Sequence, residues 1–386
     1  MIKVVSRYPQ ELPSNRGIFI STYIGDIHFG VTNADPELEY KILKEQYIDK
    51  IRNMNVLHAI FITGDLFDRR VMANSNVVYY TSLFIQDIVQ VAIEKQCTIL
   101  LLKGTDSHDS DQLKLFYHYM EDTRIDFRVI ETIRFEWIHG VKILCIPELY
   151  DVPEYIYDNV LKYSGLYDQC VFHGTVEGSV YGNNTIANAK LFTIDDFKNC
   201  CGPIVGGHIH TGGCFNTHIY YTGSPIRYKF GEEGTKGFLI GVHDLDSRYY
   251  LMHLEEIKSF RYDTILLDDI LNQDPKDVIA YINDLKVSKN IDHLRVKFTD
   301  DLSDDFINII NAYYKNKRDI KLQFEYDKKS KVMKKNIQEL ESMSQYDFIL
   351  DKTLTEYDIL SRYINIQKGY EYITSERLKT ILEESI

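Results

Sequence analysis

The sequence predicts an α/β protein whose main part is a layered domain. Between residues 18 and 250, short apolar runs alternate with segments whose apolar residues recur at helical spacing. Three apolar runs end in the turns Gly-Asp, Gly-Asp and Gly-Thr-Asp, at residues 25–26, 64–65 and 104–106. In layered α/β domains with this β-α-β-α-β order, functional side chains gather in loops at the carboxyl ends of strands.

The elements of this main domain follow in order along the chain. We expect strands over residues 18–24, 58–63 and 98–103, separated by helices over 36–54 and 76–96. Further strands are predicted over 142–146, 170–172, 203–205, 218–222 and 237–242. We assign residues 1–255 to this domain.

The sequence pattern changes after about residue 255. Strands over 261–267, 293–298 and 320–326 and helices over 275–285 and 304–314 predict a small α+β unit with a β-α-β-β-α-β-like order. We assign residues 256–335 to this second domain. Residues 336–386 contain no proline and no glycine except Gly369, and they predict helices, with candidates over 355–367 and 375–385.

Composition limits the function classes. The 386 residues are 44% hydrophobic and 26% charged, which is ordinary for a globular protein. No apolar run approaches the ~20 residues of a membrane span, and no signal peptide is recognisable, so we expect a cytoplasmic protein without a membrane partner. The six cysteines have no C-x-x-C spacing, which disfavours a zinc finger. The net charge of −13 disfavours a uniform nucleic-acid wrapping surface, but metal ions and a local basic patch leave a nuclease open.

Five short segments carry metal-type side chains, each where an apolar run gives way to a glycine-containing turn. They are GDIHFG (25–30), GDLFDRR (64–70), GTDSHD (104–109), FHG (172–174) and GGHIH (206–210). Asp26 and His28 are two residues apart, so on an extended segment both point to one side, as do His208 and His210. Asp65 can bridge two ions with its two oxygens. One histidine alone is more often structural, but five ordered motifs predict a pair of divalent cations with N and O ligands.

These motifs resemble the calcineurin-like metallophosphoesterase superfamily. Within it, the stretch YTGSPIRYKFGEEGTKGF (221–238) is similar to SbcD-type nuclease subunits of DNA double-strand-break repair complexes. The resemblance covers residues 18–250. It implies a four-layer β-sandwich flanked by helices, with a small α+β capping domain and C-terminal helices.

The resemblance also implies roles for individual residues. Asp26, His28 and His210 would hold the first metal, His173 and His208 the second, and Asp65 would bridge them. His108 would contact the scissile phosphate or act as a general acid, and Asp68 joins His108 and Asp65 as a catalytic residue. Manganese is the family's usual ion, with magnesium as the alternative.

The third motif departs from the family's Gly-Asn-His-Asp pattern. Alignment on His-Asp places Ser107 where the family has its asparagine ligand to the second metal. Asp106, Thr105 or a water could supply that ligand instead. The second metal site is therefore the less secure of the two.

The implied activity is metal-dependent phosphodiester hydrolysis at DNA ends, as a double-strand exonuclease and single-strand endonuclease in repair, recombination or replication. The implied partners are DNA and an SbcC-type coiled-coil ATPase, bound through residues 336–386. Helices near 37–54 and 76–96 would form a homodimer. The setting would be the cytoplasm or nucleoid of a bacterium or a bacteriophage-infected host.

Basic residues supply candidate DNA contacts. Residues 313–335 contain nine lysines or arginines, among them Lys317, Arg318 and Lys321, which could grip phosphates or form a solvated face. Arg69, Arg70, Arg227 and Lys229 flank the metal motifs. Two rival functions remain open: another phosphatase or nucleotide phosphodiesterase of the superfamily, and a non-catalytic scaffold for the ATPase.

Overall fold

The chain divides into two compact units. The computed structural model describes residues 4–5 and 17–324, apart from 33, 151–156, 158–159, 162–164, 180–190, 233, 269–272, 300–301 and 318. The first unit contains residues 1–263 and 289–293, and the second contains 264–288 and 294–386. The predicted helices over 355–367 and 375–385 lie outside the described residues.

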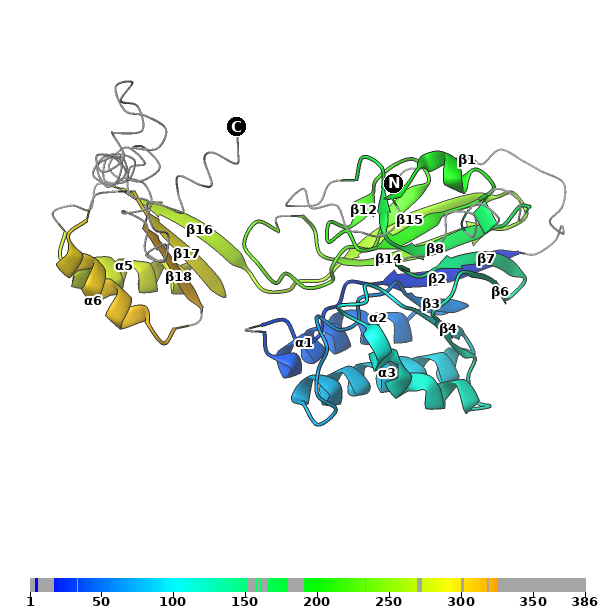
Figure 1. Ribbon diagram of the computed structural model, residues 1–386, viewed down its shortest axis with the longest axis horizontal. Coiled ribbons are helices and arrows are strands. Elements are labelled where there is room, and N and C mark those ends of the chain that lie inside the picture. The colour runs from blue at the N-terminus through cyan, green and yellow to red at the C-terminus, as the bar shows by residue number, and fades with distance from the viewer. Residues whose placement is uncertain are drawn as a thin grey trace, which may run out of the picture. The chain divides into compact units, whose positions relative to one another are not determined.

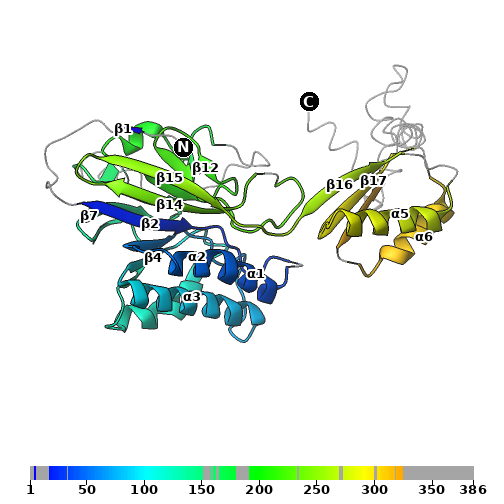
Figure 2. The ribbon, with the colours of Figure 1, turned by 180° about the vertical axis from the view of Figure 1, so that it is seen from behind.

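The first unit contains a seven-stranded sheet with the order β1-β15-β14-β2-β3-β4-β5. Strands β2 to β5 are mutually parallel. Strand β14 lies between β2 and β15 and runs antiparallel to both (Figure 2). The strands are β1 (Val4–Val5), β2 (Ile18–Ile24), β3 (Ala59–Ile62), β4 (Thr98–Leu102), β5 (Phe127–Ile130), β14 (Gly237–Asp244) and β15 (Tyr249–Glu256).

A six-stranded sheet of the same unit has the order β12-β13-β11-β8-β7-β6. Strands β7, β8, β11 and β13 are parallel to their neighbours, and β6 and β12 close the two edges antiparallel. The strands are β6 (Arg134–Ile138), β7 (Val141–Ile146), β8 (Gln169–His173), β11 (Ile204–Gly207), β12 (Gly213–Cys214) and β13 (Ile219–Tyr221). A short parallel pair, β9 (Thr175–Val176) and β10 (Leu191–Phe192), is separate. The architecture is therefore mixed α/β, as predicted.

Helices cover one face of the seven-stranded sheet (Figure 1). The predicted helix over 36–54 consists of α1 (Pro36–Leu43), a π-helical turn (Lys44–Ile48) and α2 (Asp49–Arg52). Asp35 caps α1 by accepting from the backbone N–H of Glu37. Ser75 caps α3 (Asn76–Lys95), which ends where Gln96 adopts a left-handed conformation. Side-chain caps thus mark where α1 and α3 begin.

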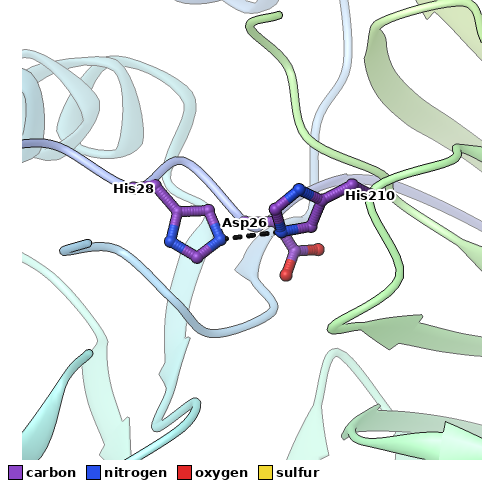
Figure 3. Close-up of side chains that lie close together, drawn as sticks. All are labelled: Asp26, His28 and His210. Atoms are coloured by element: carbon purple, nitrogen blue, oxygen red, sulfur yellow. Dashed lines mark hydrogen bonds between the residues drawn. The ribbon is translucent and has the colours of Figure 1, made fainter. Parts of the chain in front are cut away.

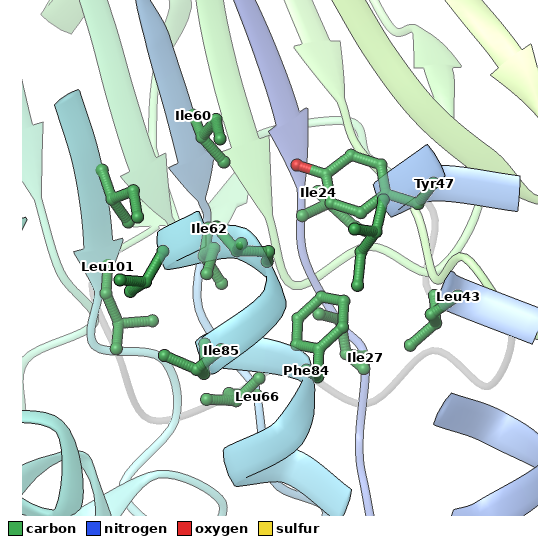
Figure 4. Packing of buried hydrophobic residues seen from close by; sticks show 14 of the residues in the cluster. Ile24, Ile27, Leu43, Tyr47, Ile60, Ile62, Leu66, Phe84, Ile85 and Leu101 are labelled. Atoms are coloured by element: carbon green, nitrogen blue, oxygen red, sulfur yellow. The ribbon is translucent and has the colours of Figure 1, made fainter. Parts of the chain in front are cut away.

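Three hydrophobic clusters define the layers. Ile60 and Ile62 of β3 face helix α3, where they meet residues such as Phe84 (Figure 4). The intervening Phe61 packs into a second cluster that also contains Val171 of β8, so the two large sheets lie face to face. A third cluster covers the other face of the six-stranded sheet. Strands buried on both faces are apolar throughout, which explains the unbroken apolar runs in the sequence.

The second unit is a small α+β structure. Its strands β16 (Tyr262–Leu267), β17 (His293–Phe298) and β18 (Ile320–Phe324) form a three-stranded sheet in that order, with β17 and β18 parallel. Helices α5 (Pro275–Ser288) and α6 (Asp304–Tyr314) alternate with the strands and pack on each other. The described elements run β-α-β-α-β and lie where the individual strands and helices were expected; the additional strand of a β-α-β-β-α-β order is not found among the described residues.

Several strands and helices of the first unit were not predicted from the sequence. Strands β5 and β6 and the 3-10 helix Ser110–Glu121 lie between the third motif and β7, and β15 follows β14. The missed β6 and β15 are partly exposed, so their sequences mix polar and apolar residues. Among the described residues, no helix has the length and apolar character needed to cross a membrane.

Candidate metal centre

The motif residues follow the carboxyl ends of parallel strands in both large sheets. Asp26, Asp65 and His108 lie beyond β2, β3 and β4, which pair in parallel and therefore end at one edge of their sheet. His173 ends β8 and His208 follows β11, whose last residue, Gly207, pairs with His173. Direct hydrogen bonds join the two edges: the backbone N–H of His208 donates to Asp26 Oδ1 at 2.8 Å.

The structure gathers seven of these side chains into three overlapping clusters. The first cluster contains Asp26, His28 and His210 (Figure 3), the second contains His28, Asp65 and His108, and the third contains Asp65, His173 and His208. Within each cluster the candidate ligand atoms all lie within 4.8 Å of one another. Because His28 and Asp65 each belong to two clusters, the clusters form one continuous group that could hold a metal ion.

The first cluster is built around two imidazoles that face each other. Nε2 of His28 and Nε2 of His210 are 3.0 Å apart (Figure 3). Two nitrogen ligands that share one ion through bonds of about 2.1 Å at a right angle would be separated by about 3 Å. Nδ1 of His210 lies 3.1 Å from Glu232 Oε1, so Nδ1 donates to that carboxylate and Nε2 is left to bind.

Asp26 supplies an oxygen to the first cluster. Its carboxylate is fully buried, and Oδ2 has no hydrogen-bond partner. Burial raises the pKa of Asp26. A buried carboxylate oxygen without a hydrogen bond costs folding free energy unless it coordinates a cation, so this atom is suited to be a metal ligand.

The third cluster is built around His173. Nδ1 of His173 donates to the carbonyl oxygen of Thr63 at 2.6 Å, which orients Nε2 toward Asp65 Oδ2 at 3.3 Å. Burial lowers the pKa of His173, but Asp65 outweighs burial and raises this pKa well above its ordinary value.

Asp65 remains an ionised carboxylate at the centre of the group. Burial would raise its pKa, but the neighbouring His173 outweighs burial and holds the pKa well below its ordinary value. Burial keeps the pKa of His28 well below its ordinary value, so this imidazole is neutral. An ionised carboxylate and a neutral imidazole are the protonation states that metal binding requires.

Asp109 shapes the loops that carry the ligands. Its buried carboxylate accepts from the backbone N–H groups of Asp65, Leu66, Phe67 and Gly104. Burial, followed by the nearby Asp65, raises the pKa of Asp109 to about 7. A Cβ atom on Gly104 would lie against the backbone N and the side chain of Asp65, so only glycine fits there.

Several ligand-bearing residues have unusual backbone conformations. Asp26, His28, Asp65 and His208 have φ values of 50°, 55°, 51° and 94°. Non-glycine residues in this left-handed region cost about 1–3 kcal/mol each, and such strain concentrates at functional sites. The clustering of four such residues at one group indicates that the loops are shaped for binding.

His108 and Asp68 border the second cluster. Nδ1 of His108 is hydrogen-bonded to the backbone carbonyl oxygen of Asp68, and the His108 ring lies edge-on to His28 with centroids 4.8 Å apart. Asp68 is partly exposed, and its Oδ1 is 3.8 Å from Nδ1 of His28. Both side chains therefore lie at the partly exposed rim of the group.

The third motif presents Thr105, rather than Ser107, to the third cluster. Ser107 is exposed, and the exposed Asp106 forms an ion pair with Lys103. In contrast, Thr105 Oγ1 lies 3.2 Å from Asp65 Oδ2. Of the three side chains considered for the missing asparagine ligand, only Thr105 contacts the group.

Three acidic residues that contact the ligand group were not predicted from the sequence. Glu148 follows β7, Glu232 supports His210, and Asp109 organises the ligand loops. Glu232 and Asp109 lie inside stretches already singled out, but no spacing marked them. Glu148 lies outside every motif and carried no sequence signal.

Most of the candidate DNA-contact residues that the structure describes are exposed. Arg69 and Arg70 are exposed just beyond the Asp65 loop, and Lys229 is exposed with its Nζ 3.8 Å from Glu232. Arg227 is partly buried. In the second unit, Lys317 lies over the Tyr313 ring and Lys321 is exposed. Arg318 and the basic residues over 328–335 lie outside the described residues.

Comparisons with known proteins do not identify the chain. No protein-family model and no curated protein matches it. One solved crystal structure aligns with 62% of this chain and 100% of its own, at 12% identity and a TM-score of 0.38. A likeness at that level defines neither fold nor function.

Proposed function

We propose that this protein is a two-metal phosphodiesterase of the calcineurin-like class. The observation that carries the proposal is the sharing of Asp65 between two ligand clusters. A buried, ionised carboxylate flanked by two sets of imidazoles suits a pair of ions bridged by one residue. The two face-to-face sheets, with helices on one outer face, are compatible with the four-layer sandwich of that class.

The residues of the group would have two roles in phosphate-ester hydrolysis: metal ligands and a proton donor. Asp26, His28 and His210 would hold one ion, His173 and His208 the other, and Asp65 both. When bound, the ions supply positive charge that lowers the pKa of a nearby water and stabilises charge developing on the phosphate. His108, at the rim, contacts the phosphate and donates a proton to the leaving oxygen, with Asp68 beside it.

Manganese is the ion we propose, with magnesium as the alternative. The donor set mixes imidazole nitrogens with carboxylate oxygens and contains no cysteine. Such N and O ligands are compatible with manganese, which is the usual ion of the family that the chain resembles.

We propose DNA as the substrate, in the manner of SbcD-type nucleases. The stretch 221–238, which carries that resemblance, surrounds His210: Glu232 accepts from its Nδ1, and the buried Lys236 donates to its backbone carbonyl oxygen at 3.1 Å. The exposed Arg69, Arg70 and Lys229 supply positive charge near the group for a polyanionic substrate.

We also propose protein partners and a cellular context. An SbcC-type ATPase would bind residues 336–386, and a second copy would pack on α1 and α3, where Leu38 and Tyr79 are exposed. Repair, recombination or replication of DNA in bacterial or phage-infected cytoplasm would be the context. A truncation after residue 340 that still copurifies with the ATPase would remove the proposed role of the C-terminal segment.

Cleavage of end-labelled duplex DNA, with and without Mn²⁺, tests the proposed activity. The wild-type protein should cut DNA only with the ion. His108→Gln should slow cutting by about 10²–10⁴-fold, and Asp65→Asn should abolish it. His118→Gln, which removes an exposed histidine outside the group, is the matched control and should cut normally. Wild-type rates for Asp65→Asn, or indifference to EDTA, would overturn the proposal.

The rival functions predict different results in parallel assays. A phosphatase would turn over a nitrophenyl phosphate monoester faster than the diester and leave DNA ends intact. A scaffold would bind no ions, which elemental analysis of the purified protein would reveal. Two ions per chain together with DNA cleavage would support the nuclease.

A further inference from the structure

Glu148 is a buried acid that the proposed ligand set does not use. It follows Pro147 beyond the end of β7, and its side chain is 1% exposed. Its backbone N–H donates to the carbonyl oxygen of Lys103 at 3.3 Å, so the residue is anchored where the third motif begins. Glu148 therefore reaches the ligand group from a strand that carries no metal motif.

The two carboxylate oxygens of Glu148 have different surroundings. Oε1 accepts from the hydroxyl of Tyr150 at 2.5 Å. Oε2 lies 3.0 Å from Nδ1 of His208, 3.5 Å from Nε2 of His173 and 3.3 Å from Thr105 Oγ1. One oxygen is thus held by Tyr150, while the other points at the two histidines of the third cluster.

The ionic neighbours of the buried Glu148 carboxylate are histidines of the candidate ligand set. Among the described residues, no lysine or arginine lies within ion-pair distance of Glu148, whose ionic neighbours are His173 and His208. Nε2 of His173 is itself fully buried and has no hydrogen-bond partner. A buried carboxylate and a buried imidazole nitrogen that point at one space suit a cation there.

We propose that Glu148 Oε2 is a ligand of the second metal ion and replaces the neutral ligand that the third motif lacks. The inference rests on the proposed two-metal function. It also accounts for the exposed Ser107 and for Asp106 being paired with Lys103, since neither is needed as a ligand. With Asp26 and Asp65, Glu148 brings three carboxylates to two divalent ions and makes the second site anionic.

An anionic second site has a measurable consequence. A carboxylate binds a divalent cation more tightly than an amide or hydroxyl oxygen in the same place, because it adds charge attraction. Glu148→Gln should therefore weaken the second ion at least tenfold and leave the first unchanged. Glu148→Asp, which keeps the charge on a shorter side chain, should retain the second ion more tightly than Glu148→Gln.

Titration with Mn²⁺, followed by the electron paramagnetic resonance signal of the free ion, measures both sites in the purified full chain. The matched control is Asp168→Asn, which removes a buried carboxylate at the opposite edge of the same sheet, where it accepts from the backbone N–H of Lys142 at 2.9 Å. This control should bind two ions like the wild type. Equal second-site affinity in the wild type, Glu148→Gln and Glu148→Asp would overturn the inference.

A crystal structure with Mn²⁺, read by anomalous scattering, separates a ligand from a residue that only orients His208. As a ligand, Oε2 should lie within about 2.2 Å of the second ion. An ion bound without Glu148, with Oε2 still hydrogen-bonded to His208, would overturn the inference and leave the two-metal function standing. A wild-type protein that binds no ion would instead overturn the proposed function.

Discussion

Nε2 of His28 and Nε2 of His210 lie 3.0 Å apart, although 182 residues separate them in the sequence. Two imidazole nitrogens at this distance either share a proton or share an ion. The buried Oδ2 of Asp26 in the same cluster has no hydrogen-bond partner, and a bound cation would compensate it.

Metal removal should therefore destabilise the first unit. Adding Mn²⁺ at about 100 times its dissociation constant should raise the free energy of unfolding by about 2.7 kcal/mol per site. Thermal unfolding of the protein with EDTA and with Mn²⁺ measures the effect. His210→Gln should reduce the metal-dependent rise in Tm, while His118→Gln should leave it intact. An identical Tm in EDTA and Mn²⁺ would contradict this expectation.

Glu232 should tune the first ion through His210. Glu232→Gln removes the negative charge that Nδ1 of His210 contacts at 3.1 Å, which makes Nε2 a weaker ligand. Changes of this kind lower metal affinity by about 10–100-fold. Calorimetric titration with Mn²⁺ should show the loss at one site only. Glu255→Gln, which breaks a pair with Lys50, is the control, and an equal loss there would refute the role.

Asp109 should contribute stability through its backbone contacts. Asp109→Asn replaces one accepting oxygen by an N–H₂ group, so at least one buried backbone N–H loses its partner. Each such loss costs about 1–3 kcal/mol. Urea unfolding should show this decrease, whereas Asp111→Asn, at an exposed residue paired with Lys114, should change stability little. Equal stability of the two variants would argue against the role given to Asp109.

Glu39 should make stability fall as pH rises. Burial raises the pKa of this helix α1 residue to about 8, above its ordinary 4.5. The folded state therefore holds a proton that the unfolded state releases between these values. The free energy of unfolding should fall by about 1.4 kcal/mol per pH unit across that window from this group.

Glu39→Gln should remove that pH dependence. The variant should gain stability over the wild type at pH 8 and little at pH 4, as measured by chemical unfolding across the range. Glu37→Gln is the control on the same helix, because Glu37 bonds to Lys41 and its pKa is lowered instead. A wild type and Glu39→Gln with parallel stability profiles would show that Glu39 is ionised in the fold.

Much of the main domain could be predicted from local patterns. Strands β2 to β4 are buried on both faces, so their apolar runs are unbroken and easily recognised. Helix α6 was predicted with its observed bounds, since Ser303 and an amphipathic pattern mark it. The partly exposed β6 and β15 were missed because their alternation is weak.

The candidate ligands were also readable from the sequence. Asp26, Asp65 and His173 directly follow or end parallel strands, and parallel strands place their carboxyl ends at one edge of a sheet. Connectivity along the chain therefore predicted that Asp26 and Asp65 would lie close together, whereas the packing of the two sheets brings His173 to them. Which of them binds an ion remains for the metal titrations to test.

The sequence by itself determined the α/β class and the motif side chains, because strand periodicity and turn residues are local properties. Only the tertiary structure decided that Thr105 turns inward while Ser107 faces solvent, and that Glu148 reaches His208 from β7. Those contacts depend on how the loops after β4, β7 and β11 pack against one another where the two sheets meet. The spacing of residues along the chain does not predict this loop packing, because it results from the packing of strands that are distant in sequence.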